Sequence, residues 1–248
     1  MVQKIRLILI IFLISCSSSN KNESGAIDIF YLFDVSKPHL VHMSHATNLS
    51  EAIYNEFSES TFPIWPQQHM ISTIDRFGLK QKAPCSAYLD NSGPSFGPGA
   101  NKKKVTPFIS DCIPGILNHS GSNRTDIWGA VYYAVNAMDN DKFGKALIIF
   151  SDFEPHPDDT LAKTGKMKEI KQQVNLNGIS VILIFSESNT KTKGTMKENV
   201  STMKAEFLSK GAFEVKIINL TSIPNNVSSL EGGAKNIFNH LIQSFRSQ

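Results

Sequence analysis

The chain carries little charge and no concentration of one sign, which argues against a protein that binds nucleic acid. Charged residues make up 19% of its 248 residues, and the formal net charge is +3. The densest basic run, Lys102-Lys103-Lys104, has no interleaved aromatics and is typical of a solvated loop. With 41% hydrophobic residues and no internal repeat, the composition predicts one ordinary globular domain.

The apolar run at the start of the chain is too short to span a bilayer as a helix. It covers Leu7 to Ile14, follows Lys4 and Arg6, and ends in Leu13-Ile14-Ser15-Cys16. This order of basic start, short apolar core, small residue and cysteine resembles the lipobox of bacterial lipoproteins. The resemblance implies cleavage before Cys16, lipidation of that cysteine and a membrane anchor made of acyl groups. The alternative is an ordinary secretory signal with a coincidental cysteine.

We therefore expect three parts along the chain: a lipoprotein signal peptide at 1–16, a flexible tether at 17–25 and a folded domain at 26–248. The expected location is the cell envelope, with the lipid anchor in a membrane. Ser17 after the lipidated cysteine, in place of an Asp, would suit the outer membrane if the cell has one.

Cysteine is scarce, because beyond Cys16 the chain has only Cys85 and Cys112. Neither has a nearby histidine at a recognisable catalytic spacing, which argues against a nucleophilic or metal-binding role. Both lie in a middle section rich in Pro, Gly and Ser, and an exported compartment permits their oxidation. We predict a disulfide between them that closes this section.

Apolar runs alternate with helical patterns after the tether, which predicts a three-layer α/β/α sandwich with a mostly parallel sheet. Residues 78–120 hold many Gly, Pro, Asn and Lys and are expected to form an insertion. We expect strands at 27–33, 68–74, 146–150, 179–185 and 213–218, and helices at 47–59, 125–139, 160–176, 196–209 and 229–245.

Two aspartates stand where strongly apolar strands end, Asp34 after the first run and Asp152 after the run from Ala146. Loops beyond the carboxyl ends of neighbouring parallel strands form one crevice, in which ligands bind. Ser36 points to the same side as Asp34 on an extended backbone. With Thr125 before a helix, these residues offer hard oxygen ligands suited to Mg²⁺ or Mn²⁺.

These residues resemble the von Willebrand factor A domain, whose metal-ion-dependent adhesion site is written Asp-x-Ser-x-Ser, then Thr, then Asp, on three loops. Asp34-Val35-Ser36 is similar to the first part, Thr125 to the second and Asp152 to the third. The resemblance covers the folded domain apart from the insertion. It implies a Rossmann-like fold, a metal held by these four residues, and a protein partner whose acidic side chain completes the coordination.

Two positions depart from the family pattern. Pro38 stands where the family has its second Ser, and Phe153 follows the last Asp where Gly is common. Because Mg²⁺ normally keeps several waters, we expect the missing hydroxyl to weaken the site without abolishing it. One alternative is a degenerate domain that keeps the fold without the ion. In others, the two aspartates merely begin loops and Thr125 merely caps a helix.

The favoured prediction is a lipid-anchored binding module without enzymatic activity. The rival is a metal-dependent phosphohydrolase of the haloacid dehalogenase type, which also places an Asp after its first strand. That chemistry requires a second carboxylate two residues later as acid and base, and this chain has Ser36 there. A nucleophile-elbow motif with Ser, His and Asp is also lacking.

Three histidines, His39, His42 and His45, recur at three-residue spacing and offer a second metal hypothesis, because imidazole suits Zn²⁺ or Cu²⁺. The alternative is a surface cluster that binds nothing. The polar side chains after the last metal loop are expected to form a solvated rim or to contact a partner: Glu154, His156, Asp158 and Asp159.

Overall fold

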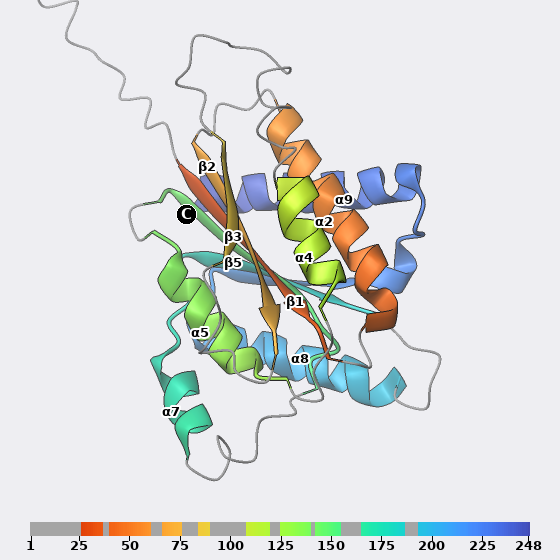
Figure 1. Ribbon diagram of the computed structural model, residues 1–248. Coiled ribbons are helices and arrows are strands. Elements are labelled where there is room, and N and C mark those ends of the chain that lie inside the picture. Colours follow the sequence, from red (N-terminus) through yellow and green to blue (C-terminus); the bar gives the residue numbers. More distant parts are fainter. Residues whose placement is uncertain are drawn as a thin grey trace, which may run out of the picture.

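A six-stranded sheet forms the middle layer of the computed structural model (Figure 1). Its strands lie in the order β3-β2-β1-β4-β5-β6, and every neighbouring pair is parallel except β2 with β3. The strands are β1 (Ile27–Asp34), β2 (Gln67–Ile74), β3 (Cys85–Leu89), β4 (Gly144–Phe150), β5 (Ile179–Phe185) and β6 (Glu214–Asn219). The structure describes residues 26–36, 40–60, 66–75, 84–89, 108–119, 125–139, 142–154, 165–186 and 193–248.

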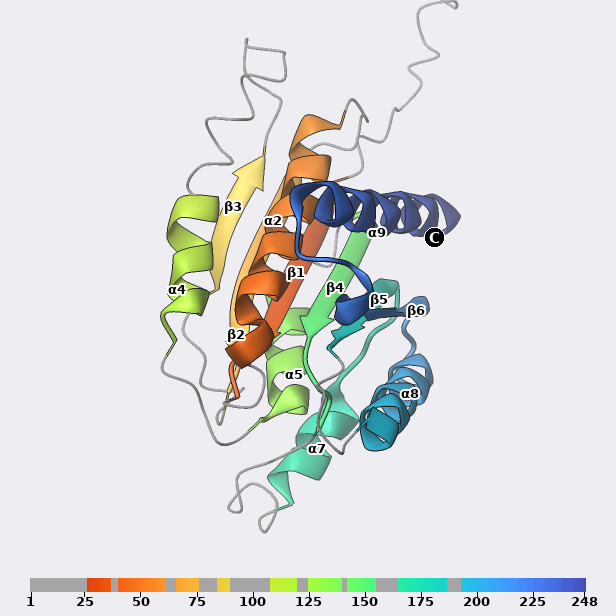
Figure 2. The ribbon, with the colours of Figure 1, turned by 90° about the vertical axis from the view of Figure 1, so that its right-hand side faces the viewer.

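Helices cover both faces of this sheet (Figures 1 and 2). One face carries α2 (Met43–Glu59), α4 (Ile113–Leu117) and α9 (Val227–Ser247), and the other carries α5 (Ile127–Ala137), α7 (Lys166–Gln173) and α8 (Lys193–Ser209). Three short helical segments precede the helices of the first face. They are η1 (Leu40–His42) before α2, η3 (Phe108–Cys112) before α4 and η4 (Leu220–Ser222) before α9. The predicted three-layer α/β/α sandwich with a mostly parallel sheet is therefore confirmed.

Strand β1 lies in the centre of the sheet and is buried on both faces. Tyr31 and Phe33 pack toward α2 and α9, whereas Phe30 and Leu32 pack toward α5. Because side chains alternate across a strand, burial on both faces requires an unbroken apolar run rather than an alternating one. This requirement explains why the first strand was easy to recognise in the sequence as one apolar run.

The observed helices shift in places from the expected ranges. The helix expected at 160–176 is shorter and spans Lys166–Gln173, and α2 begins at Met43, before the expected residue 47. Gly178 has a φ of 69° in the turn that leads from α7 into β5, a conformation that favours glycine.

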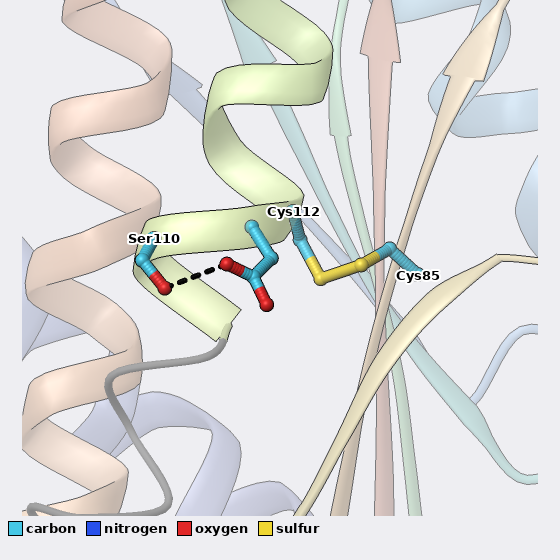
Figure 3. Close-up of a disulfide and its surroundings, with 4 residues drawn as sticks. Cys85, Ser110 and Cys112 are labelled. Carbon is cyan, nitrogen blue, oxygen red and sulfur yellow. Dashed lines mark hydrogen bonds between the residues drawn. A yellow bond between two sulfur atoms is a disulfide. The ribbon is translucent and has the colours of Figure 1, made fainter.

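The segment expected as an insertion contributes to the fold at one edge of the sheet. There β3 pairs antiparallel with β2, and η3 leads into α4. A disulfide joins Cys85 of β3 to Cys112 of η3, with 5.5 Å between their Cα atoms, in agreement with the predicted pairing (Figure 3). It ties this helical segment to the edge strand.

A buried polar network lies beneath η3. The hydroxyl of Tyr31 donates to Nδ1 of His69 at 3.2 Å, and Nε2 of His69 donates to Oε1 of Gln67 at 3.0 Å. This tautomer follows because the amide oxygen can only accept. The ring of Phe108 lies against Tyr31, His69 and Tyr54. Burial lowers the pKa of His69 to about 3, so its ring is neutral at neutral pH.

No helix among the described residues is long and apolar enough to cross a membrane. The expected signal peptide and tether, including Cys16, lie outside the described residues, as do Pro38 and His39.

Candidate functional site

The carboxyl ends of the parallel strands bring the predicted ligands to one edge of the sheet. Asp34 is the last residue of β1, and Asp152 follows the end of β4. The register pairs Phe33 with Phe150, so the loops after these two strands start side by side. Two of the predicted ligand loops therefore meet at the crevice that parallel sheets commonly use to bind ligands.

The carboxylate of Asp34 is fully buried and held by hydrogen bonds from two loops. Its Oδ1 accepts from the backbone N–H of Ser36 at 2.8 Å. Its Oδ2 accepts from the hydroxyl of Ser151 at 2.7 Å. Because each carboxylate oxygen has two lone pairs, both atoms can accept a further bond from a cation or a metal-bound water. The two loops thus fix a buried negative charge in one orientation.

The hydroxyl of Ser36 is the least satisfied group in this network. Ser36 is 3% exposed, and its Oγ has no hydrogen-bond partner among the described residues. A buried polar atom without a partner costs about 1–3 kcal/mol, so its presence calls for an explanation such as an ion or an ordered water. A hydroxyl oxygen beside a fixed carboxylate is the donor set that a hard cation requires.

Thr125 lies at the same edge, beside the end of β2, but it does not cap the helix that follows. Asp126 is the N-cap of α5, because its Oδ1 accepts from the backbone N–H of Gly129 at 2.9 Å. Its own N–H donates to the carbonyl of Asp75, directly after β2. The alternative that Thr125 serves merely as an N-cap is therefore wrong, since the carboxylate of Asp126 caps the helix. Thr125 itself is buried.

The loop that carries Asp152 contains the one described non-glycine residue with a positive φ. Phe153 has a φ of 57°, at the position where the resembled family commonly has Gly. This left-handed conformation costs about 1–2 kcal/mol for a residue with a side chain. The ring of Phe153 is buried in the core beside α5 and α7, which offsets that cost.

The strained turn also completes the hydrogen bonds of the site. The N–H of Phe153 donates to Oγ of Ser151 at 2.9 Å, and the N–H of Glu154 donates to Oδ1 of Asp152 at 2.9 Å. Ser151 therefore accepts from Phe153 while it donates to Asp34. The conformation of Phe153 holds the hydroxyl that orients the central carboxylate.

Two hydroxyl residues at this edge were not predicted as part of the site. Ser151 stands directly before Asp152, and that position was its only signal in the sequence. Ser186 directly follows β5, is 2% exposed, and has an Oγ without a hydrogen-bond partner among the described residues. Since β5 is the neighbour of β4, Ser186 belongs to the same edge of the sheet.

The geometry thus links Asp34 directly to Ser36 and, through Ser151, to the loop of Asp152, while Thr125 is placed at the same edge by the end of β2. Within the described ranges, no three His, Cys, Asp or Glu side chains converge as a metal cluster. The oxygen donors are instead two carboxylates and hydroxyls, a set that fits Mg²⁺ or Mn²⁺ better than a soft metal. Of the expected rim, Glu154 is exposed, and His156, Asp158 and Asp159 lie outside the described residues.

Comparison with known proteins finds similarity in structure alone. No family model matches the sequence, and no curated protein matches it. The pilus adhesin SpaC from Lactobacillus rhamnosus GG is similar with a TM-score of 0.51 and 11% identity, over 89% of this chain and 30% of the adhesin. This chain therefore corresponds to less than a third of that protein's length.

Two further structures are similar at lower scores. An aerotolerance-related membrane protein from Bacteroides fragilis has a TM-score of 0.47 and 12% identity, over 90% of this chain and 100% of that chain. A von Willebrand factor type A protein from Catenulispora acidiphila has a TM-score of 0.45 and 9% identity, over 86% of this chain and 32% of that chain. These scores are too low to add to the fold assignment. The topology and the match to SpaC together give this chain a three-layer α/β/α fold with a mostly parallel sheet.

Proposed function

We propose that this protein is a binding module that docks a protein partner through a divalent cation held by Asp34, Ser36, Thr125 and Asp152. The observation that carries the proposal is the hydroxyl of Ser36, buried without a hydrogen-bond partner beside the oriented carboxylate of Asp34. A Mg²⁺ or Mn²⁺ ion would satisfy that oxygen and neutralise the buried charge. An acidic side chain of the partner would complete the coordination of the ion.

The anchoring part of the proposal rests on the sequence. A lipidated Cys16 and the tether at 17–25 would hold the domain at the surface of a membrane in the cell envelope. Metabolic labelling with a fatty acid should mark the wild-type protein and leave the Cys16→Ala variant unmarked. Equal labelling of both would remove the anchor from the proposal.

The rival function, a phosphohydrolase, finds less support in the arrangement of β1. The position two residues after Asp34 would have to supply an acid and base, and it holds Ser36, whose backbone N–H binds the Asp34 carboxylate.

The decisive experiment measures Mn²⁺ and Mg²⁺ binding by calorimetry in matched variants. Asp34→Asn should weaken binding by roughly tenfold or more, since it removes the charge while keeping the shape of the side chain. Ser36→Ala should weaken it by a smaller factor. The matched control is Asp28→Asn, which neutralises another fully buried carboxylate of β1 at the opposite end of the strand. Binding should persist in this control.

A second arm separates docking from catalysis. If the proposal is right, a chelator and Asp34→Asn should each release the same partner in a pull-down, with the domain still folded by circular dichroism. Turnover of a generic phosphate ester in Mg²⁺ that disappears in Asp34→Asn would establish the phosphohydrolase instead. If the wild-type protein binds neither ion, the remaining explanation is a degenerate domain that keeps the fold without the metal.

A further inference from the structure

Two histidines at the start of α2 lie outside the site described above. His42 ends η1, and His45 follows in the first turn of α2. Residues three apart on a helix are neighbours on its surface, with Cβ atoms about 5–6 Å apart. Both side chains are half-buried, and Nε2 of each has almost no contact with solvent. The structure therefore gives the predicted spacing a helical geometry.

The ring of His45 is held by the segment that leads into α9. It hydrogen-bonds to the backbone of Ile223, directly after η4. Its Nε2 has no hydrogen-bond partner among the described residues, so the bond to Ile223 comes from Nδ1. A ring that donates from Nδ1 to a backbone carbonyl carries its lone pair on Nε2. Histidines that bind metals are commonly oriented by such a second bond.

The protonation state of the pair is also suited to ligation. Burial lowers the pKa of His42, and burial together with the nearby His42 lowers the pKa of His45, against a smaller opposing effect of the bond to Ile223. Both rings are therefore neutral at neutral pH. A metal binds the neutral imidazole, so it has no proton to displace.

We propose that His42 and His45 form a second metal site, in which the two Nε2 atoms bind one divalent transition-metal ion such as Zn²⁺ or Cu²⁺. Imidazole nitrogen suits these borderline metals, whereas the oxygen donors near Asp34 suit Mg²⁺ and Mn²⁺. Within the described part of the chain the pair has no third His, Cys, Asp or Glu to form a cluster. Water would fill the remaining positions, so binding should be reversible, in the micromolar range.

This second site would act on the same end of the molecule as the first. The chain passes from Asp34 and Ser36 to η1, and His45 contacts the segment before α9. A metal held by both rings would fix the junction of η1 with α2. The domain with the metal bound should therefore resist thermal unfolding more than the domain without it.

The test is Cu²⁺ and Zn²⁺ binding to the purified full-length protein, measured by calorimetry and by the visible absorption of the copper–imidazole complex. The wild type should bind one equivalent with micromolar affinity. His42→Gln and His45→Gln should each weaken binding by roughly tenfold or more. The controls are His240→Gln, which removes a half-buried histidine paired with Glu214, and Asp34→Asn. Both should bind as the wild type does.

Two outcomes would overturn the proposal. One is unchanged affinity in the double variant His42→Gln and His45→Gln, and the other is loss of binding in Asp34→Asn, which would place the metal at the carboxylate site. A measurement on the wild type avoids any effect of the substitutions on folding. Substoichiometric Cu²⁺ should broaden the ring proton signals of His42 and His45 before those of His119 and His240. Broadening in the opposite order would contradict the proposal.

Discussion

Strand β1 belongs to two buried polar networks that differ in how completely they are satisfied. In the first, Tyr31 and Gln67 use both ring nitrogens of His69. In the second, at the end of the same strand, both oxygens of Asp34 accept hydrogen bonds but the hydroxyl of Ser36 has no hydrogen-bond partner among the described residues. A closed network stabilises one packing, whereas an open one retains a donor atom for a ligand. The two predict different responses to mutation.

The largest expected effect comes from acid and acts on the closed network. The pKa of His69 is about 3 in the folded protein and about 6.5 when unfolded, so the unfolded state binds more protons below pH 6.5. The stability is fully present above pH 6.5. It should be lost as the pH falls toward 3, by about 1.4 kcal/mol per unit.

Urea denaturation at a series of pH values measures this loss. The variant His69→Gln removes the titrating ring, so its stability should fall less steeply between pH 6.5 and 4 than that of the wild type. The difference between the two slopes excludes the contribution of the carboxylates, which both proteins share. Equal slopes would mean that the buried histidine doesn't determine acid stability.

The next effect concerns the disulfide that holds η3 over the closed network. Cys112 ends η3, whose Phe108 packs on His69. Replacing both Cys85 and Cys112 by Ser should lower the free energy of unfolding by about 3 kcal/mol, since the closed loop separates them by 27 residues. Chemical denaturation gives the stability, and mass mapping of a non-reduced digest shows the bond. Two free thiols in freshly purified protein would contradict the pairing.

The same double variant sharpens the contrast between the networks. Loss of the bond loosens η3 above His69 but leaves Asp34, Ser36 and Ser151 untouched, because these lie on other elements. Mn²⁺ affinity measured below the unfolding transition should therefore stay at the wild-type value. A parallel fall in affinity would show that the two networks are coupled.

The smallest effect concerns Phe153 in the open network, where we expect Gly to be more stable than Ala, the reverse of the usual order. Replacing a buried Phe costs about 3–5 kcal/mol in either Phe153→Ala or Phe153→Gly. At ordinary positions Gly is less stable than Ala, but the φ of 57° favours Gly here. Phe153→Gly should therefore be more stable than Phe153→Ala by about 1–2 kcal/mol in urea denaturation. The usual order, with Ala the more stable, would show that the turn carries no strain.

The sequence alone was sufficient to locate the central strands, because these strands are buried on both faces. Such strands read as continuous apolar runs, and those at β1, β4 and β5 were located within a residue or two of their observed ends. The strand β3 and the helical segment with Cys112 could not be seen, because their stretch is rich in Gly, Pro and polar residues. Strand β3 forms by pairing with β2, and the disulfide holds the helical segment against β3. Both contacts join residues that are distant in the sequence, so a local pattern does not reveal them.

The site was foreseeable only where a local pattern carries it. Asp34 and Ser36 share one short motif, so their proximity follows from the sequence. The bond from Ser151 to Asp34 spans 117 residues and depends on the register of β1 with β4, which a local pattern does not contain. Thr125 was the candidate for the helix cap in the sequence, and the structure shows that its neighbour Asp126 is the N-cap instead.

The central position of β1 also has a consequence for how the chain folds. This strand comes first along the described chain, yet one of its two neighbours is β4, whose pairing joins Ile27 to Gly144. Pairs so distant along a chain form slowly, because a long loop must close before the contact stabilises anything. During synthesis, β1 therefore keeps one edge unpaired until β4 has been made, and by then nearly half of the protein has followed it. Such an edge invites pairing with other chains, so the yield of this protein should depend on chaperones that shield β1 during that interval.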